Sequence, residues 1–278
     1  MSRDTRQDQI SKKMVVYRIP GMEGAKVRRD VAYRVTGAGP LTADVYHPPG
    51  SDGGAPIAAV VIVAGYPDPG FQKVVGCKFK EMGSTVSWAQ LFAASGLAAI
   101  TYTNREPEAD LHALLQYVRQ EAAPMGVDGD RIGLWASSGN VPLALSVLMQ
   151  GGGGPLRCAA LCYGYMLDLD GSTGVAEAAE KFGFVNPSAG KSVADLPKDL
   201  PLFIARAGRD EMPHLNEAID RFLVKALTHN RPLTFVNHPT APHAFDLFHD
   251  CEATRETVRQ ILAFMQFRLS AFPTGRRA

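Results

Sequence analysis

Short apolar runs alternate with amphipathic stretches along most of the chain. Residues 57–63 form a continuous apolar run, which is typical of a strand buried on both faces. In residues 107–122, Leu111, Leu114 and Val118 recur at the spacing that places them on one face of a helix. The same two patterns predict strands at 97–102, 158–163, 201–207 and 233–238, and helices at 85–95, 141–149, 215–227 and 252–269. This alternation predicts an α/β fold with a mostly parallel central sheet flanked by helices.

The N-terminal part of the sequence has a different pattern. Residues 13–20, 29–35 and 41–46 alternate between apolar and polar positions, which predicts early strands that pair antiparallel. Residues 1–12 are polar and charged, so we expect a flexible N-terminal segment there and no secretory signal.

Two further segments lie between the predicted strands and helices. Residues 64–80 are predicted to form a loop after the strand at 57–63. Residues 165–200 interrupt the alternation, and they contain a helix-like stretch at 175–184 followed by Pro, Gly and Ser. We expect a small cap-like insertion there, either above the active site or packed on the core without meeting a ligand. The whole chain, residues 1–278, is expected to be a single domain.

Composition and charge narrow the possible partners. The formal net charge of +1 gives no reason to expect nucleic acid or membrane as a partner, and no apolar run reaches membrane-spanning length. The four cysteines are too scattered for a disulfide framework, so a reduced, cytoplasmic compartment is expected, with Cys158 and Cys162 packed on one strand face. There is no C-x-x-C or H-E-x-x-H motif, and His238, His243 and His249 do not follow helical spacing. We therefore expect no metal and no cofactor.

The most informative motif is a serine between a predicted strand and a predicted helix. Residues 131–140 read Arg-Ile-Gly-Leu-Trp-Ala-Ser-Ser-Gly-Asn, which is typical of a nucleophile elbow. Such a turn needs small residues two positions before and after the nucleophile. This requirement favours Ser138, flanked by Ala136 and by Asn140, which tolerates left-handed geometry, over Ser137, which follows the bulky Trp135 by two positions. The alternative is a plain strand-to-helix turn in which the serine only caps the helix.

Two further candidate residues follow the ends of later predicted strands. Asp210 comes after the strand at 201–207, and His243 lies in a Pro-rich loop after the strand at 233–238. The order Ser138, Asp210, His243 is the one expected when each partner follows a later strand of one parallel sheet. Taken singly, Asp210 could only add charge to the next helix, and His243 could be a loop histidine bonded to backbone.

With these motifs the sequence resembles the α/β-hydrolase superfamily, and within it the dienelactone-hydrolase-like and esterase branch. The resemblance spans about residues 31–269, and the segments that carry it are 41–48, 59–67, Ser138 with its elbow, 208–210 and 242–245. Two features depart from the family pattern. The loop at 64–70 lacks a His-Gly-Gly-Gly run, and the elbow lacks both outer glycines. These departures leave the substrate class open.

The chemistry of these groups predicts a serine hydrolase that cleaves a small-molecule carboxylic ester through an acyl-enzyme. Ser138 is the expected nucleophile, His243 the base and Asp210 the group that orients it. The backbone N–H groups of Gly139 and Tyr66 are the expected oxyanion hole, with the Tyr66 hydroxyl as a third candidate donor. The residues expected to bind substrate are Gly65, Tyr66 and Tyr163.

Several alternatives to a short-chain or modest-chain ester stay open at this point. Lactones, thioesters and peptides suit the same triad. A non-catalytic binding module with this fold is a further alternative, because the elbow lacks its outer glycines. A homodimer also stays open.

Overall fold

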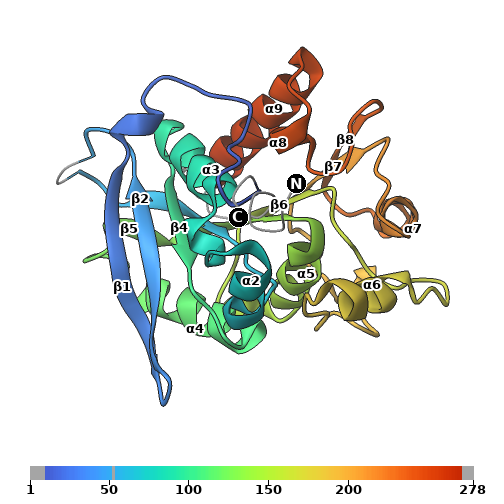
Figure 1. The fold of residues 1–278 in the computed structure, drawn as a ribbon, viewed down its shortest axis with the longest axis horizontal. Helices are drawn as coiled ribbons and strands as arrows, with labels where there is room; N and C mark the ends of the chain where they lie inside the picture. The colour runs from blue at the N-terminus through green and yellow to red at the C-terminus, as the bar shows by residue number, and fades with distance from the viewer. Residues whose placement is uncertain (1–9, 52–53, 271–278) are drawn as a thin grey trace, which may run out of the picture.

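A computed structural model describes residues 10–51 and 54–270, so most of the predicted flexible segment 1–12 lies outside the described residues. Figure 1 shows a central sheet with helices on both of its faces. The strands are β1 (Lys26–Thr36), β2 (Gly39–His47), β3 (Ile57–Ile62), β4 (Ala98–Tyr102), β5 (Val127–Ser137), β6 (Cys158–Cys162), β7 (Leu202–Ala207) and β8 (Leu233–His238). The α-helices are α2 (Asp68–Val75), α3 (Gly83–Ala94), α4 (Pro107–Gln120), α5 (Val141–Met149), α6 (Gly174–Phe182), α7 (Leu215–Thr228), α8 (Phe245–Phe248) and α9 (Glu252–Leu269).

The eight strands form one sheet in the order β1-β2-β4-β3-β5-β6-β7-β8. The pairs β1/β2 and β2/β4 are antiparallel, and all pairs from β4/β3 to β7/β8 are parallel. The predicted mostly parallel sheet with an antiparallel N-terminal part is therefore confirmed. Because parallel strands end at the same edge, the loops after β3, β5, β6, β7 and β8 gather at one side of the sheet.

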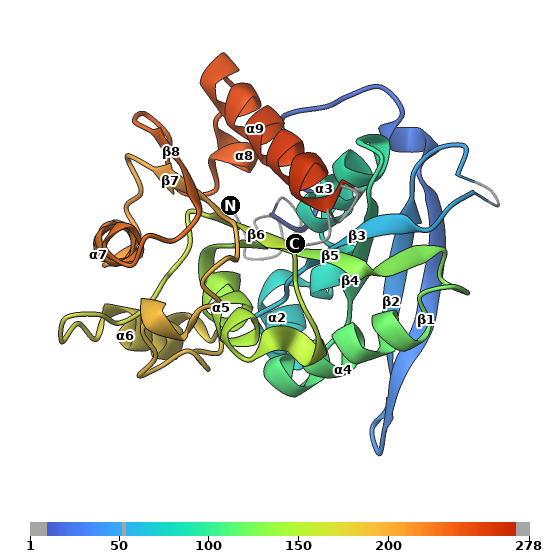
Figure 2. The same cartoon turned by 180° about the vertical axis from the view of Figure 1, so that it is seen from behind.

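Helices cover the sheet on both faces, with α3 and α9 on one face and α4 and α5 on the other (Figures 1 and 2). The residues of β3, β4 and β6 are almost all buried, as their continuous apolar sequences predict. Helix α5 is buried along nearly its whole length, and it carries Pro142 in its first turn, where the missing N–H needs no partner. Cys158 and Cys162 are buried in β6, as expected, and all four cysteines are free thiols.

Two predictions about local structure were wrong. Residues 13–20 do not form a strand. Val15 is buried there, its N–H donates to Ser87 Oγ at 3.0 Å, and the next N–H donates to the Asp246 carbonyl. The predicted loop 64–80 contains helix α2, which begins just after Pro67. No helix among residues 10–51 and 54–270 is long and apolar enough to cross a membrane.

Candidate active site

The chain makes a sharp turn where β5 passes into α5. Ser138 sits at this turn with φ 53°, in the left-handed region that a non-glycine residue adopts only at some cost. Ser137, directly before it, has extended backbone with φ −136°. The turn projects the Ser138 side chain out of the sheet edge, which is the geometry of a nucleophile elbow.

The structure brings Ser138, His243 and Asp210 together in one hydrogen-bonded row. Ser138 Oγ lies 2.9 Å from His243 Nε2, and His243 Nδ1 lies 2.7 Å from Asp210 Oδ2. The Asp210 side chain is fully buried, and its other oxygen accepts the Met212 N–H at 3.0 Å. The imidazole is therefore held in one orientation, with its Nε2 facing the serine hydroxyl.

The loop after β3 approaches the elbow closely. A Cβ on Gly65 would lie 2.9 Å from Asn140 Cα, so only glycine fits at this position. The Gly65 N–H donates to Asn140 Oδ1 at 2.7 Å, and the Gly65 carbonyl accepts from the Val185 N–H at 2.9 Å. No described residue accepts a hydrogen bond from the neighbouring Tyr66 N–H.

Asn140 has a different role from the one that the motif suggested. Its backbone is right-handed, with φ −84°, so its tolerance of left-handed geometry is not used here. Its side chain instead bridges the two loops: Oδ1 accepts from Gly65, and Nδ2 donates to the Ser137 carbonyl at 3.0 Å. No local sequence pattern predicts this bridge, because Gly65 and Asn140 lie 75 positions apart in the chain.

The Tyr66 side chain covers the elbow. Its hydroxyl oxygen would lie 2.4 Å from a Cβ built on Gly139, so glycine is required there as well. Burial raises the pKa of Tyr66 to about 12, with a smaller opposing effect from a hydrogen bond to Ser138. The hydroxyl is therefore protonated at neutral pH and can donate. Phe184 packs edge-on against the ring, with 5.9 Å between the ring centres.

The sequence analysis did not single out Asp246, a buried acid near His243. Asp246 is 2% exposed and accepts from Tyr163 Oη at 2.5 Å and from Trp88 Nε1 at 2.7 Å. Burial raises the pKa of Asp246, and the hydrogen bond from Tyr163 opposes this effect. The Tyr163 ring meets the His243 ring edge-on at 5.2 Å between centres. The Tyr163 ring therefore lines the site, while the Tyr163 hydroxyl donates its hydrogen bond to Asp246.

A cavity of about 280 Å³ opens beside Ser138 and His243. Seven of the residues that line it are aromatic, and they are Tyr66, Phe71, Phe79, Trp88, Trp135, Tyr163 and Phe248. Residues 165–200 approach the site from another side. The Tyr165 N–H donates to the Ser138 carbonyl at 3.3 Å, and Phe184 stacks on the Tyr165 ring.

Comparisons with solved structures identify the fold. A bacterial heroin esterase has a TM-score of 0.71 at 15% identity, covering 97% of this chain and 91% of its own. A thermophilic esterase from the Planctomycetes species Thermogutta terrifontis has a TM-score of 0.66 at 20% identity, covering 92% and 96%. The α/β-hydrolase enzyme MGS-M1 from a Medee basin deep-sea metagenome library has a TM-score of 0.63 at 14% identity, covering 88% and 98%.

The chain therefore has the α/β-hydrolase fold, and the resemblance inferred from its motifs is confirmed at the level of the fold. No protein-family model matches the sequence, and no curated protein matches it in a sequence comparison. At such low identity the shared fold does not assign an activity, so function has to be argued from the site.

Proposed function

We propose that the protein is a serine hydrolase that cleaves carboxylic esters with short or modest acyl chains. The observation that carries this proposal is the row of hydrogen bonds from Ser138 through His243 to buried Asp210, with the serine at a strained turn. A serine hydroxyl is a weak nucleophile at neutral pH, so a base within hydrogen-bond distance is the feature that gives it reactivity.

In the proposed reaction, His243 Nε2 takes the proton from Ser138 Oγ as the oxygen attacks the ester carbonyl. Asp210 stabilises the imidazolium that forms. The imidazolium then protonates the leaving alcohol, and an acyl-enzyme remains on Ser138. Water attacks this acyl-enzyme with the same base, which releases the carboxylic acid and restores the serine.

The carbonyl oxygen becomes negatively charged in each step and needs preorganised donors. The Tyr66 N–H and the Gly139 N–H are the proposed donors. One contact supports this assignment: Asn140 Oδ1 accepts the hydrogen bond of the neighbouring Gly65 N–H, and this bond holds the loop against the elbow. The protonated Tyr66 hydroxyl beside Gly139 is the proposed third donor.

The lining and the volume of the cavity favour a substrate with a small apolar acyl group. Its aromatic wall favours burial of hydrocarbon next to Ser138, and its volume of about 280 Å³ is small for a substrate site. Structures of the Thermogutta terrifontis esterase hold bound propionate and bound butyrate, and others are phosphoramylated by tabun or phosphonylated by sarin. We infer the same acyl class and the same type of reactive serine for this chain.

A fluorophosphonate probe followed by peptide mapping tests the proposal. We expect labelling at Ser138 in the wild type and in Ser137→Ala, and none in Ser138→Ala. Turnover of p-nitrophenyl esters should be highest for propionyl and butyryl groups and should fall for long chains. A non-catalytic binding module would not be labelled, and preference for a lactone or thioester in the same panel would redirect the substrate assignment.

A further inference from the structure

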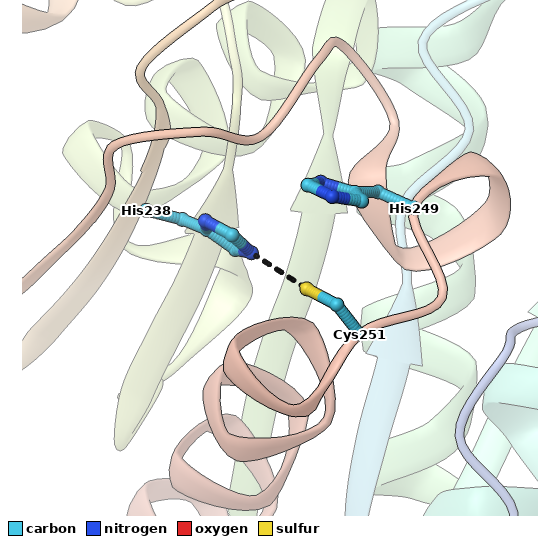
Figure 3. Close-up of side chains that lie close together, drawn as sticks. All are labelled: His238, His249 and Cys251. Atoms are coloured by element: carbon cyan, nitrogen blue, oxygen red, sulfur yellow. Dashed lines mark hydrogen bonds between the residues drawn. The ribbon is translucent and has the colours of Figure 1, made fainter.

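Three potential metal ligands meet on the face of the sheet covered by α9. His238 is the last residue of β8, His249 directly follows α8, and Cys251 directly precedes α9. One ligand atom from each of the three lies within 4.8 Å of the other two. Figure 3 shows the two imidazole rings and the thiol facing one another across a short gap. The sequence spacing of the three matches no common metal motif, so only the fold brings them together.

The distances suit a tetrahedral ion. His238 Nε2 lies 3.7 Å from Cys251 Sγ. Zinc bonds of about 2.0 Å to nitrogen and 2.3 Å to sulfur at a tetrahedral angle place these two atoms about 3.5 Å apart. The ligand atom of His249, a half-buried residue, lies within 4.8 Å of both.

The chemistry of the three side chains favours zinc. A thiolate with imidazole nitrogens is the donor set that zinc prefers.

The Nδ1 atoms of both histidines have no hydrogen-bond partner among the described residues. His238 is 2% exposed, and its other ring nitrogen, Nε2, is the atom that faces Cys251. The two rings stack with 5.3 Å between their centres. Buried polar atoms without partners are uncommon, so the hydrogen bonds of the fold do not fully account for this cluster of rings.

We propose that His238, His249 and Cys251 bind a divalent ion of the zinc class through three protein ligands, with the fourth position open. The Thr254 hydroxyl lies 3.1 Å from His238 Nε2 and 3.5 Å from Cys251 Sγ, where it can hold a water at that position. The ion ties the end of β8 to the start of α9. It therefore fixes both ends of the segment that carries His243, and metal occupancy stabilises this segment.

Cobalt(II) titration of the untagged, reduced full-length protein tests the site, because a thiolate ligand gives cobalt a charge-transfer band. We expect one equivalent of cobalt to produce the band and zinc to displace it. Cys251→Ser keeps a good helix cap and should abolish the band. His249→Gln should weaken affinity at least about 100-fold, since loss of a supporting group alone costs about 10- to 100-fold. Cys77→Ser, at the other half-buried cysteine, should behave as the wild type.

Thermal unfolding with and without zinc gives a second readout. The wild type and Cys77→Ser should unfold at a higher temperature with zinc, while Cys251→Ser should show no shift. Absence of the cobalt band in the folded wild type would overturn the proposal. A band that persists in Cys251→Ser but disappears in Cys77→Ser would place the metal elsewhere, and it would overturn the proposal equally.

Discussion

The bridge made by Asn140 gives the sharpest test of the site. Glycine is the usual residue at this position of the elbow, so Asn140→Gly restores the family motif, and a motif-based argument expects a neutral or improved enzyme. The structure instead predicts that Asn140→Gly lowers both stability and kcat. Asn140 already has right-handed backbone and gains nothing from glycine, while its side chain bonds to the Gly65 N–H and the Ser137 carbonyl.

The magnitude follows from those two hydrogen bonds. Asn140 is 4% exposed, so its removal leaves the Gly65 N–H without a partner, which costs about 1–3 kcal/mol. Loss of the bond to Ser137 adds about 1 kcal/mol, and the flexibility of glycine about 0.5–1 kcal/mol. The total of about 2.5–5 kcal/mol corresponds to a fall of about 4–9 °C in unfolding temperature at about 2.1 cal/mol/K per residue for 278 residues.

Catalysis should suffer as well, because the bridge sets the distance from the Tyr66 N–H to the elbow. Outright loss of an oxyanion donor costs about 10²- to 10³-fold, so a displaced donor should lower kcat about 10- to 100-fold with KM nearly unchanged. Thermal unfolding and steady-state kinetics on one butyryl ester measure both effects. Asn140→Ala is the control, and it should match Asn140→Gly in kcat. Wild-type kcat and unfolding temperature in Asn140→Gly would refute the reasoning.

Three further substitutions test the remaining groups by steady-state kinetics. Asp210→Asn should lower kcat about 10⁴-fold because the amide favours the wrong imidazole tautomer, while exposed Glu211→Gln should be neutral; the reverse order would contradict the assignment. Tyr66→Phe should lower kcat about 10²-fold if its hydroxyl donates to the oxyanion, and an unchanged kcat would remove that role. Gly139→Ala should lower kcat by at least about 10²-fold in a folded protein, because its Cβ would lie 2.5 Å from Phe184 Cδ1; full activity would place the reacting carbonyl elsewhere.

The strands of the parallel sheet could be predicted because burial on both faces leaves a simple pattern in the sequence. Residues 57–63 and 158–163 are apolar throughout, and each corresponds to a central strand within one residue. The alternation in residues 13–20 was misleading. Val15 is buried and Ile19 is partly buried there, while the backbone bonds to Ser87 and to Asp246, and such partners leave no local pattern.

Part of the active site could also be predicted from the sequence and part could not. Each member of the triad follows a strand end, so the meeting of Ser138, Asp210 and His243 follows from the order of strands in a parallel sheet. The contacts that hold the neighbouring loops in place do not follow from that order. Asn140 bonds to a residue 75 positions away, and Asp246 accepts from a tyrosine 83 positions away. Single-sequence patterns carry no information on such pairs.

The backbone at Ser138 bears on the choice between an enzyme and a binding module. A non-glycine residue in the left-handed region costs about 1–3 kcal/mol, and the surrounding structure must hold it there. Simple helix capping needs no such conformation, since a capping residue has extended backbone. The strain brings Ser138 Oγ within 2.9 Å of His243 Nε2, whose other nitrogen faces a fully buried carboxylate. A binding module would gain nothing from this costly arrangement, whereas acyl transfer depends on each part of it.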